Sequence, residues 1–338
     1  MIKILELFET YKQEINQYKI IIVANVRNHT GNFKSITLNK ANPIEFFSDD
    51  EFDQICNGIS SLGIFTKIYY NELDFIEDVL NQKYVVNKII VINFARNGII
   101  EGKKSLVPAF CDLLNIKYTT SNAFVQSLCR DKFVWSCVLR QAGLPSLKTL
   151  YIQGNYVADI DTIYNNELYI LKPKSESSSL HVGGAVNKQK VLSFVQNNKE
   201  DYIVQKYLCG IEIEVPFFEL NGDYFIQEPV QINYSGNILC ENLSEENDYY
   251  YSDCQLTKTE MLNIKEIALK TAKILNIKKY GRIDFKLDRD SSAYIIDIAT
   301  LPYLTKNSSF AFAASRQNLH YNSIFKALLT IAFLSVQS

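Results

Sequence analysis

The sequence predicts an α/β protein, and two patterns near its beginning carry that prediction. Residues 19–26 and 88–94 are short runs rich in β-branched residues, and residues 49–62 between them carry apolar residues at helical spacing. A strand, a helix and a strand in this order indicate a parallel sheet. A further helix is predicted over residues 105–115. We therefore expect a first α/β lobe that covers residues 1–120.

The middle of the chain predicts a second group of elements. Apolar residues recur at helical intervals over residues 121–142, and Gly143-Leu-Pro145 ends that helix. Thr257 and Glu260 have the spacing of a capping box, which opens a helix that runs to Asn276. Further strands are predicted over residues 149–152, 169–172 and 202–207.

The composition is that of a globular protein with two or three domains. Of the 338 residues, 47% are hydrophobic and 21% are charged, and the formal net charge is −2. Acidic and basic residues are interspersed, so we expect no surface for nucleic acid and no polybasic stretch for a membrane. The expected partners are small molecules.

Three features predict a cytoplasmic location. Residues 1–18 mix charged and apolar residues and lack the apolar core of a signal peptide. The apolar run over residues 327–336 is broken by Thr330 and Ser335 and is too short to span a bilayer. The seven cysteines form no C-x-x-C pair, which favours reduced thiols over disulfides or a zinc site.

Residues 281–309 contain the most informative local pattern. Apolar and polar residues nearly alternate over residues 282–288 and 293–298, and turn-forming residues separate these runs, so a β-hairpin is predicted. In that hairpin, Asp284 and Asp297 can lie across from each other on one face. Two such carboxylates repel each other unless a cation or a proton lies between them. The pattern fits a Mg²⁺ site and equally a surface hairpin whose acids are solvated.

A segment rich in serine and glycine covers residues 175–184, between two predicted strands. Few bulky side chains surround its backbone N–H groups and hydroxyls, so these groups are accessible. Proteins often bind phosphates with such groups. A flexible hairpin loop is the alternative, and the segment taken alone favours it.

In their order along the chain, these signals resemble the ATP-grasp superfamily and, within it, the D-alanine–D-alanine ligase family. The resemblance extends from Lys19 onward and is strongest over residues 93–132 and 281–316, with Gly98 and Glu101 at matching positions. It implies a three-domain ATP-grasp fold, α/β in the N-terminal lobe and α+β in the ATP-grasp part. The implied domains are an N-terminal substrate domain (1–120), a central domain (121–208) and a C-terminal catalytic domain (209–338), with the nucleotide between the last two.

The resemblance implies ATP as the cofactor and assigns residues to its binding. Lys132 and Lys172 match the two lysines that contact the phosphates, although either lysine alone also fits a solvated surface position. Gln205 replaces the glutamate that faces the adenine amino group, and its amide oxygen can still accept that hydrogen bond. Glu212 matches the acid that holds the ribose hydroxyls. The other residues implied to bind the nucleotide are Glu176, Ser178, Ser179, Lys206 and Leu208.

The resemblance also implies Mg²⁺, with Mn²⁺ as an alternative, and a set of catalytic residues. Asp284 and Asp297 match two of the family's metal ligands. Arg282 matches the arginine that stabilises the transferring phosphoryl group and the tetrahedral intermediate. Ser308 matches the serine that holds the carboxylate of the second amino acid, assisted by the backbone N–H of Ser309. In the implied reaction, ATP phosphorylates a carboxylate, and an amine then displaces phosphate from the acyl phosphate.

Two departures from the family pattern lie in the same strand and turn as the metal ligands. The usual metal signature Glu-x-Asn is here Asp297-Ile-Ala299, so one carboxylate is a methylene shorter and the third ligand has no oxygen. Tyr303 replaces a glycine whose backbone N–H helps to form the oxyanion hole. We expect one metal position to be weakened and the acceptor pocket to be reshaped.

The N-terminal substrate motif of the family is missing. Where the family has a Glu-His pair followed by Ser, residues 25–31 include Arg27 and His29 but no acid. Asn97 replaces the histidine of the family's His-Gly pair. The sequence thus favours a first substrate without a free α-amine, or one with an extra carboxylate that Arg27 or Arg96 binds.

The sequence therefore predicts an ATP-dependent carboxylate–amine ligase with altered substrates, acting in specialised biosynthesis. A genuine D-alanine–D-alanine ligase and a nucleotide-binding regulatory protein without turnover stay open as alternatives. The expected substrates are a small carboxylate and an amine, both amino acids, and the resemblance leaves a homodimer open. A loop within residues 237–255 is expected to close over the site and to keep water from the acyl phosphate.

Overall fold

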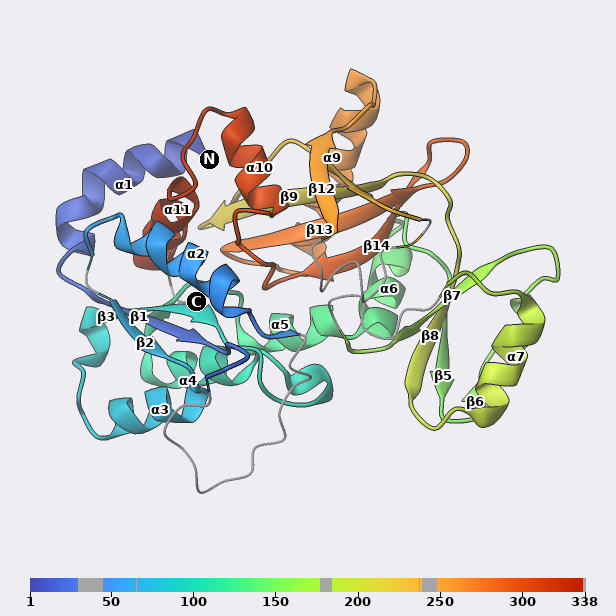
Figure 1. The fold of residues 1–338 in the computed structure, drawn as a ribbon, viewed down its shortest axis with the longest axis horizontal. Coiled ribbons are helices and arrows are strands. Elements are labelled where there is room, and N and C mark those ends of the chain that lie inside the picture. Colours follow the sequence, from blue (N-terminus) through green and yellow to red (C-terminus); the bar gives the residue numbers. More distant parts are fainter. Residues whose placement is uncertain (30–44, 65, 177–183, 237, 239–247, 337–338) are drawn as a thin grey trace.

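The structure is a computed structural model that describes residues 1–29, 45–64, 66–176, 184–236, 238 and 248–336. Its described residues form three β-sheets with helices packed around them, which confirms the predicted mixture of helix and sheet. The N-terminal lobe lies at one end of the molecule and the central sheet at the other, with the C-terminal sheet between them (Figure 1).

The N-terminal lobe contains a parallel four-stranded sheet, as predicted. Its strands are β1 (Lys19–Ala24), β2 (Thr66–Tyr69), β3 (Ile89–Phe94) and β4 (Lys117–Tyr118), in the order β2-β1-β3-β4. Its helices are α1 (Ile2–Ile15), α2 (Asp49–Ser60), α3 (Glu72–Leu80) and α4 (Leu106–Leu114), with 3₁₀ turns η2 (Val86–Lys88) and η3 (Ile100–Gly102). Strands β1 and β3 are almost wholly buried, which explains their uninterrupted apolar sequence. Strand β2 and helix α3 were not predicted, because four and nine residues hold too few periods of the apolar pattern.

The central part contains an antiparallel four-stranded sheet in the order β6-β5-β8-β7. Its strands are β5 (Thr149–Gln153), β6 (Tyr156–Val157), β7 (Tyr169–Pro173) and β8 (Asp201–Lys206). Its helices are α5 (Ala123–Arg130), α6 (Lys132–Gln141) and α7 (Lys188–Asn197), with the 3₁₀ turn η4 (Ile160–Thr162). The three strands predicted here are confirmed.

The prediction of one helix over residues 121–142 is wrong, because the chain breaks at Asp131 between α5 and α6. The Asp131 backbone is extended, with φ −81° and ψ 99°. Its carboxylate accepts hydrogen bonds from the backbone N–H groups of Phe133 and Val134, at 3.1 and 2.9 Å. An aspartate at this position satisfies N–H groups that a helix start leaves unpaired, so Asp131 favours a new helix over a continuous one.

The C-terminal sheet has six strands in the order β12-β11-β9-β13-β14, with β10 pairing to β9. They are β9 (Glu212–Leu220), β10 (Asp223–Ile226), β11 (Val230–Tyr234), β12 (Tyr249–Asp253), β13 (Tyr280–Leu287) and β14 (Ala293–Ala299). Helix α9 (Lys258–Ile274) packs on this sheet, and its predicted capping box between Thr257 and Glu260 is confirmed. Two helices follow the sheet, α10 (Ser309–Arg316) and α11 (Ser323–Leu334).

Helix α11 completes the core of the N-terminal lobe. Its buried face, which includes Ile324 and Leu328, shares one apolar cluster with Ile4 and Phe8 of α1 and with strands β1 and β3. Figure 1 shows α11 beside α1, at the opposite end of the colour scale. Helix α11 thus belongs to the C-terminal part of the sequence but packs in the N-terminal lobe. The domain boundaries after residues 120 and 208 stay a prediction.

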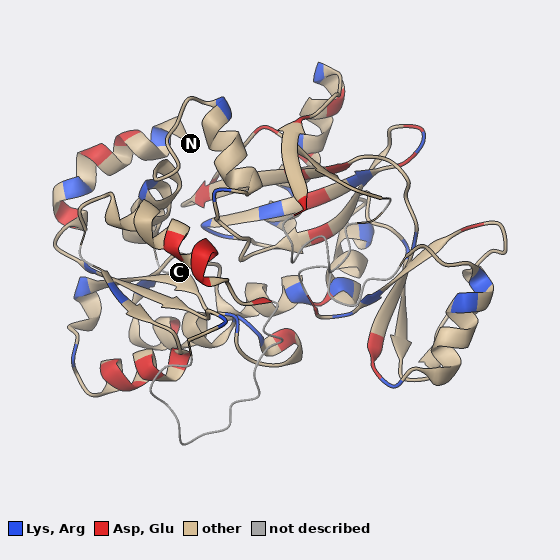
Figure 2. Ribbon diagram, in the orientation of Figure 1, with Lys and Arg blue, Asp and Glu red and all other residues tan. Residues whose placement is uncertain are grey.

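Charged residues of both signs are distributed along the ribbon (Figure 2). Within the described part of the chain, none of the helices combines the length and apolar character of a membrane span.

Leu328→Ala should destabilise the protein, because the Leu328 side chain is fully buried between α11 and the N-terminal sheet. We expect the free energy of unfolding to fall by about 2 to 5 kcal/mol, the cost of an unfilled cavity. Urea denaturation followed by circular dichroism measures this loss. Leu113→Ala is the matched control, since Leu113 is 79% exposed. Equal effects of the two substitutions would contradict the assignment of α11 to this core.

Candidate active site

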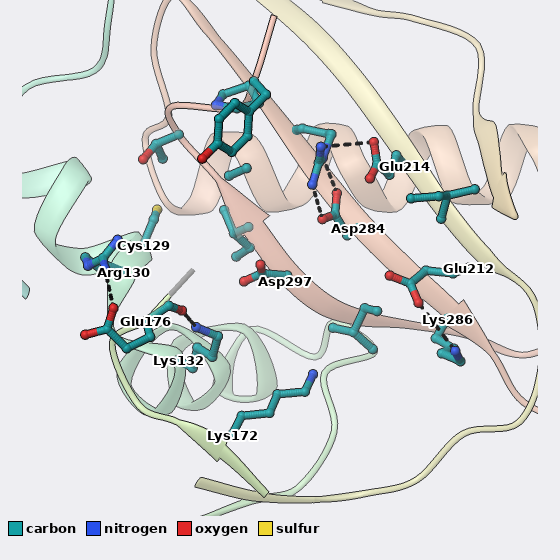
Figure 3. Close-up of a pocket in the computed structure, with 18 of the residues that line it drawn as sticks. Cys129, Arg130, Lys132, Lys172, Glu176, Glu212, Glu214, Asp284, Lys286 and Asp297 are labelled. Carbon is teal, nitrogen blue, oxygen red and sulfur yellow. Dashed lines mark hydrogen bonds and ion pairs between the residues drawn. The ribbon is translucent and has the colours of Figure 1, made fainter. Parts of the chain in front are cut away.

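One cavity lies between the central and C-terminal sheets, and residues of the N-terminal lobe close one end of it. Strands β7 and β8 form one wall, and strands β9, β13 and β14 form the other (Figure 3). The predicted site residues that line it are Lys132, Lys172, Glu176, Gln205, Lys206, Leu208, Glu212, Arg282, Asp284, Asp297 and Ser308. Ser309 is buried at the start of α10, while Ser178 and Ser179 lie outside the described residues.

The predicted hairpin of β13 and β14 is confirmed. Asp284 and Asp297 are directly paired across it, and the register shifts immediately afterwards. The Arg282 guanidinium donates to both carboxylate oxygens of Asp284 at 2.7 Å, and its Nη1 lies 3.0 Å from Glu214 Oε2. Burial raises the pKa of Asp284, and Glu214 acts in the same direction, while Arg282 opposes both.

Glu214 was missed in the sequence although a signal for it was present. In Glu212-Ile213-Glu214, the alternation of a β-strand places both acids on the same face of β9. Tyr251 on β12 donates its hydroxyl hydrogen to Glu214 at 3.2 Å and also lines the cavity. Most of the loop expected to cover the site, residues 237 and 239–247, lies outside the described residues.

Asp297 lies between Asp284 and two lysines (Figure 3). Burial raises the pKa of Asp297, but Lys132 and Lys172 outweigh it, so the carboxyl titrates below its ordinary range. Burial lowers the pKa of both lysines, while Asp297 opposes that shift. The Lys132 ammonium also donates to the backbone carbonyl of Glu176. This arrangement concentrates positive charge beside one carboxylate, as a phosphate-binding site requires.

The Gln205 side chain has a hydrogen-bonding capacity that the described residues leave unused. Its amide nitrogen donates to Thr149 Oγ1 at 2.9 Å, whereas its buried Oε1 accepts no hydrogen bond from a described residue. A buried acceptor without a donor is costly, so this oxygen fits a ligand that carries an N–H group. Leu208 is buried nearby in the same cavity wall, and the Lys206 ammonium turns outward to Glu167 at 2.7 Å.

The carboxylate of Glu212 is held at the cavity wall by two neighbours. Its Oε2 accepts from the Tyr234 hydroxyl at 2.9 Å and lies 3.4 Å from the Lys286 ammonium. Lys286 in turn donates to the Tyr234 hydroxyl at 2.8 Å. The orientation of Glu212 is thereby fixed, with further lone pairs available to hydroxyl donors.

The Ser308 hydroxyl caps helix α10. It accepts the backbone N–H of Ala311 at 3.2 Å and donates to the Thr305 carbonyl at 2.7 Å. Ser308 therefore lies at the N-terminus of a helix, where N–H groups and the helix dipole favour anions. This position agrees with the prediction that Ser308 binds a substrate carboxylate.

The residues present fit one divalent cation with few protein ligands. Within the described ranges, no group of three or more His, Cys, Asp or Glu residues could hold a metal ion. Ala299, which pairs with Arg282 across the hairpin, offers no side-chain oxygen. Mg²⁺ is commonly held by one or two carboxylates together with phosphate oxygens and water, so Asp284 and Asp297 suffice for one ion.

An acid does lie near the N-terminal substrate motif, contrary to the expectation that none is available there. The carboxylate of Glu72 accepts the side-chain amide of Asn25 at 3.2 Å and both the backbone and side-chain N–H groups of Asn97, at 3.1 and 2.7 Å. Glu72 follows β2 in the fold and is distant from the motif in sequence, so no local signal could show it. Arg27 donates to the Phe46 carbonyl at 3.2 Å and does not line the cavity.

Comparison with known proteins identifies relatives over most of the chain. The family model described as "D-ala D-ala ligase C-terminus" matches residues 143–330. D-alanine–D-alanine ligase B of Clostridium perfringens is 25% identical over 281 residues, which cover 80% of this chain and 91% of that protein. D-alanine–D-alanine ligase of a Thermoanaerobacter species is 21% identical over 289 residues, or 80% of this chain and 77% of that protein.

The fold is also similar to that of solved structures. D-alanine–D-alanine ligase from Bacillus anthracis, in a structure described as complexed with ATP, superposes with a TM-score of 0.69 at 16% identity. The match covers 94% of this chain and 97% of that chain. This likeness confirms the fold class that the sequence predicts.

Gln205→Leu should weaken ATP binding, because it removes the buried Oε1 acceptor while keeping a similar volume. The expected loss is about 2- to 12-fold in Kd, the effect of one hydrogen bond to a neutral partner. Isothermal titration calorimetry measures the affinity, and a thermal melt shows whether the variant is folded. Gln153→Leu, at an exposed position of the same sheet, is the control. An unchanged Kd for ATP would show that Gln205 does not face the adenine.

Proposed function

This chain belongs to the D-alanine–D-alanine ligase family through residues 143–330, and we propose that it joins a small carboxylate to an amine through an acyl phosphate. It is an ATP-dependent ligase that forms C–N bonds. The observation that carries the proposal is the convergence of Arg282, Asp284 and Asp297 with Lys132 and Lys172 in one cavity.

The first half of the proposed reaction is phosphoryl transfer. Lys132 and Lys172 hold the ATP phosphates, while Gln205 faces the adenine and Glu212 the ribose. An oxygen of the substrate carboxylate attacks the γ-phosphorus, and the bond to ADP breaks. Charge that develops on the phosphoryl oxygens faces the Arg282 guanidinium, which Asp284 and Glu214 hold in place.

The second half is attack by the amine. Its nitrogen bonds to the carbonyl carbon of the acyl phosphate, phosphate leaves with the C–O electron pair, and the nitrogen loses a proton to give the amide. Ser308 and the N–H of Ser309, at the start of α10, orient the carboxylate of the amine substrate. Holding both substrates between the lobes replaces a collision with a positioned encounter.

A divalent cation fits Asp284 and Asp297, and we propose Mg²⁺, with Mn²⁺ as an alternative. When bound, such a cation neutralises phosphate charge. The pairing of the two aspartates across β13 and β14 supports this assignment.

We propose that the substrates differ from two molecules of D-alanine. Asn25 belongs to the segment that stands where the family has its Glu-His pair, and Asn97 replaces a histidine. Their amides hold Glu72 instead of facing the cavity. Tyr303 lines the cavity and donates its hydroxyl hydrogen to the Glu45 carbonyl at 2.8 Å.

A genuine D-alanine–D-alanine ligase is the second candidate, which the similarity of the named relatives favours. A cytoplasmic location, a homodimer and a role in specialised biosynthesis stay predictions.

The decisive measurement is ADP formation with ATP, Mg²⁺ and a panel of amino acids and small carboxylic acids. Hydroxylamine traps an acyl phosphate as a hydroxamate and makes the first half-reaction visible without the natural amine. Arg282→Met should lower kcat by about 10²- to 10³-fold, the loss expected when a donor to developing charge is removed. The Kd for ATP should stay nearly constant.

Arg289→Met is the control for Arg282→Met, because Arg289 is an exposed arginine in the turn of the same hairpin. Arg282→Lys keeps a charge between the two buried acids and tests whether loss of folding explains the effect. Efficient formation of D-alanyl-D-alanine, identified by mass spectrometry, would favour the second candidate. ATP binding without ADP formation, whatever acid is added, would favour a regulatory protein.

Ala299→Asn should lower the Mg²⁺ concentration required for half-maximal activity. The substitution returns an oxygen ligand to a position that lines the cavity and pairs with Arg282. A decrease of about tenfold is expected, which corresponds to about 1.4 kcal/mol of metal binding. Rates measured over a series of Mg²⁺ concentrations test this, with Ala293→Asn at the far end of β14 as the control. An unchanged Mg²⁺ requirement would mean that residue 299 does not face the metal.

A further inference from the structure

A second group of basic residues lines the cavity, at the end that the N-terminal lobe closes. Arg96, Lys104 and Arg130 belong to this group. None of them matches a nucleotide-binding position, and Lys104 and Arg130 were not singled out in the sequence. Figure 3 shows Arg130 and Glu176 together at one side of the cavity, with Lys132 next to Glu176.

The backbone that presents Lys104 is strained. Its φ is +68°, in the left-handed region that non-glycine residues rarely adopt. The chain folds back here, with the Lys104 N–H donating to the Asn97 carbonyl at 3.4 Å. Gly98 allows this turn: its φ is +111°, and a Cβ there would lie 3.2 Å from the Lys103 Cα. Strain of this kind is retained where it directs a side chain to a functional place.

The ion pairs around Lys104 leave an excess of positive charge. Glu45 and Glu176 are the two carboxylates of the cluster, and each pairs with both Lys103 and Arg130, at distances of 2.7 to 3.4 Å. Lys104 forms a longer ion pair with Glu45, at 3.8 Å. Counting Arg96, four cations face two carboxylates among the described residues, an excess of two positive charges. Such an excess in a poorly solvated cavity end favours an anionic ligand.

Arg96 adds an unused donor to this end of the cavity. Its guanidinium lies 4.2 Å from the ring centre of Tyr303 and 5.0 Å from that of Phe47, and its Nη2 donates to the Leu301 carbonyl at 3.1 Å. The residue is 1% exposed, and its Nε–H finds no acceptor among the described residues. A buried donor left without an acceptor is costly, so a ligand oxygen would stabilise this site.

The electrostatics of Lys104 agree with this excess of positive charge. Burial lowers the pKa of Lys104 well below its ordinary value, and Arg130 and Arg96 add to the decrease, while Glu45 and Asp297 oppose it. The acids beside the N-terminal motif, Glu72 and Asp49, do not line the cavity, and Glu72 already accepts hydrogen bonds from Asn25 and Asn97.

From this cluster, and on the premise of the proposed ligase function, we infer that the carboxylate substrate is a dicarboxylic acid whose second carboxylate binds Lys104 and Arg96. The first carboxylate then lies toward Arg282 and receives the phosphoryl group. Tyr303 closes the end of the cavity behind Arg96. The class of substrate is thus an acid with two carboxylates and no requirement for an α-ammonium group.

The test compares each dicarboxylic acid with its own monoamide, which has nearly the same size and one charge fewer. Malonate, succinate and glutarate and their monoamides are assayed with ATP, Mg²⁺ and hydroxylamine, alongside D-alanine. For at least one pair, the KM of the diacid should lie roughly 10- to 100-fold below that of the monoamide. This is the effect expected when one hydrogen bond between charged groups is lost.

Lys104→Met should remove this preference by raising the KM of the diacid, while the KM of the monoamide, kcat and the Kd for ATP change little. A purely structural role of Lys104 would not produce this selective change. Lys104→Arg should retain part of the preference. Lys306→Met, which removes an exposed lysine two residues from Ser308, is the control. If Lys104→Met does not fold, the KM values of the diacid and its monoamide are compared in Lys104→Gln instead.

The outcomes separate the inference from the function on which it rests. ADP formation with D-alanine or the monoamides at lower KM than with any diacid overturns the inference and leaves the ligase function intact. A diacid preference that survives in Lys104→Met also overturns the inference. If no acid of any class supports ADP formation, the proposed function itself fails.

Discussion

The site depends on one buried guanidinium. Arg282 lies between Asp284 and Glu214 in the middle of the C-terminal sheet, where neither acid could stay ionised alone without a large desolvation cost. Pairing of β13 with both β9 and β14 fixes these three side chains relative to one another. Asp297, opposite Asp284, is then held facing the lysines of the central part. The geometry of the site is therefore a consequence of strand register, which a rigid sheet maintains more precisely than a loop would.

Much of this arrangement was predictable from local patterns. The alternation in β13 and β14 predicted the hairpin and the pairing of Asp284 with Asp297, and family resemblance predicted that distant lysines converge on them. The unused oxygen of Gln205 agrees with the role inferred from its position. The prediction of the hairpin succeeded because strand periodicity is a property of a short stretch of sequence.

The residues that were missed depend on contacts between distant segments. Glu72 reaches Asn25 and Asn97 only after the parallel sheet has formed, and the surroundings of Lys104 require the turn at Gly98 together with Glu45 from another loop. The break at Asp131 was missed for a local reason, since helical periodicity continues across it and only the capping chemistry marks the boundary.

The position of α11 has a consequence for how the protein is made. During synthesis the N-terminal sheet leaves the ribosome long before residues 323–334 do, so one face of that sheet lacks one of its covering helices until those residues have been made. Domains generally fold in order as they emerge, and exposed apolar surface promotes aggregation in the interval. A premature stop codon shortly before α11 would therefore leave the N-terminal lobe without part of its core.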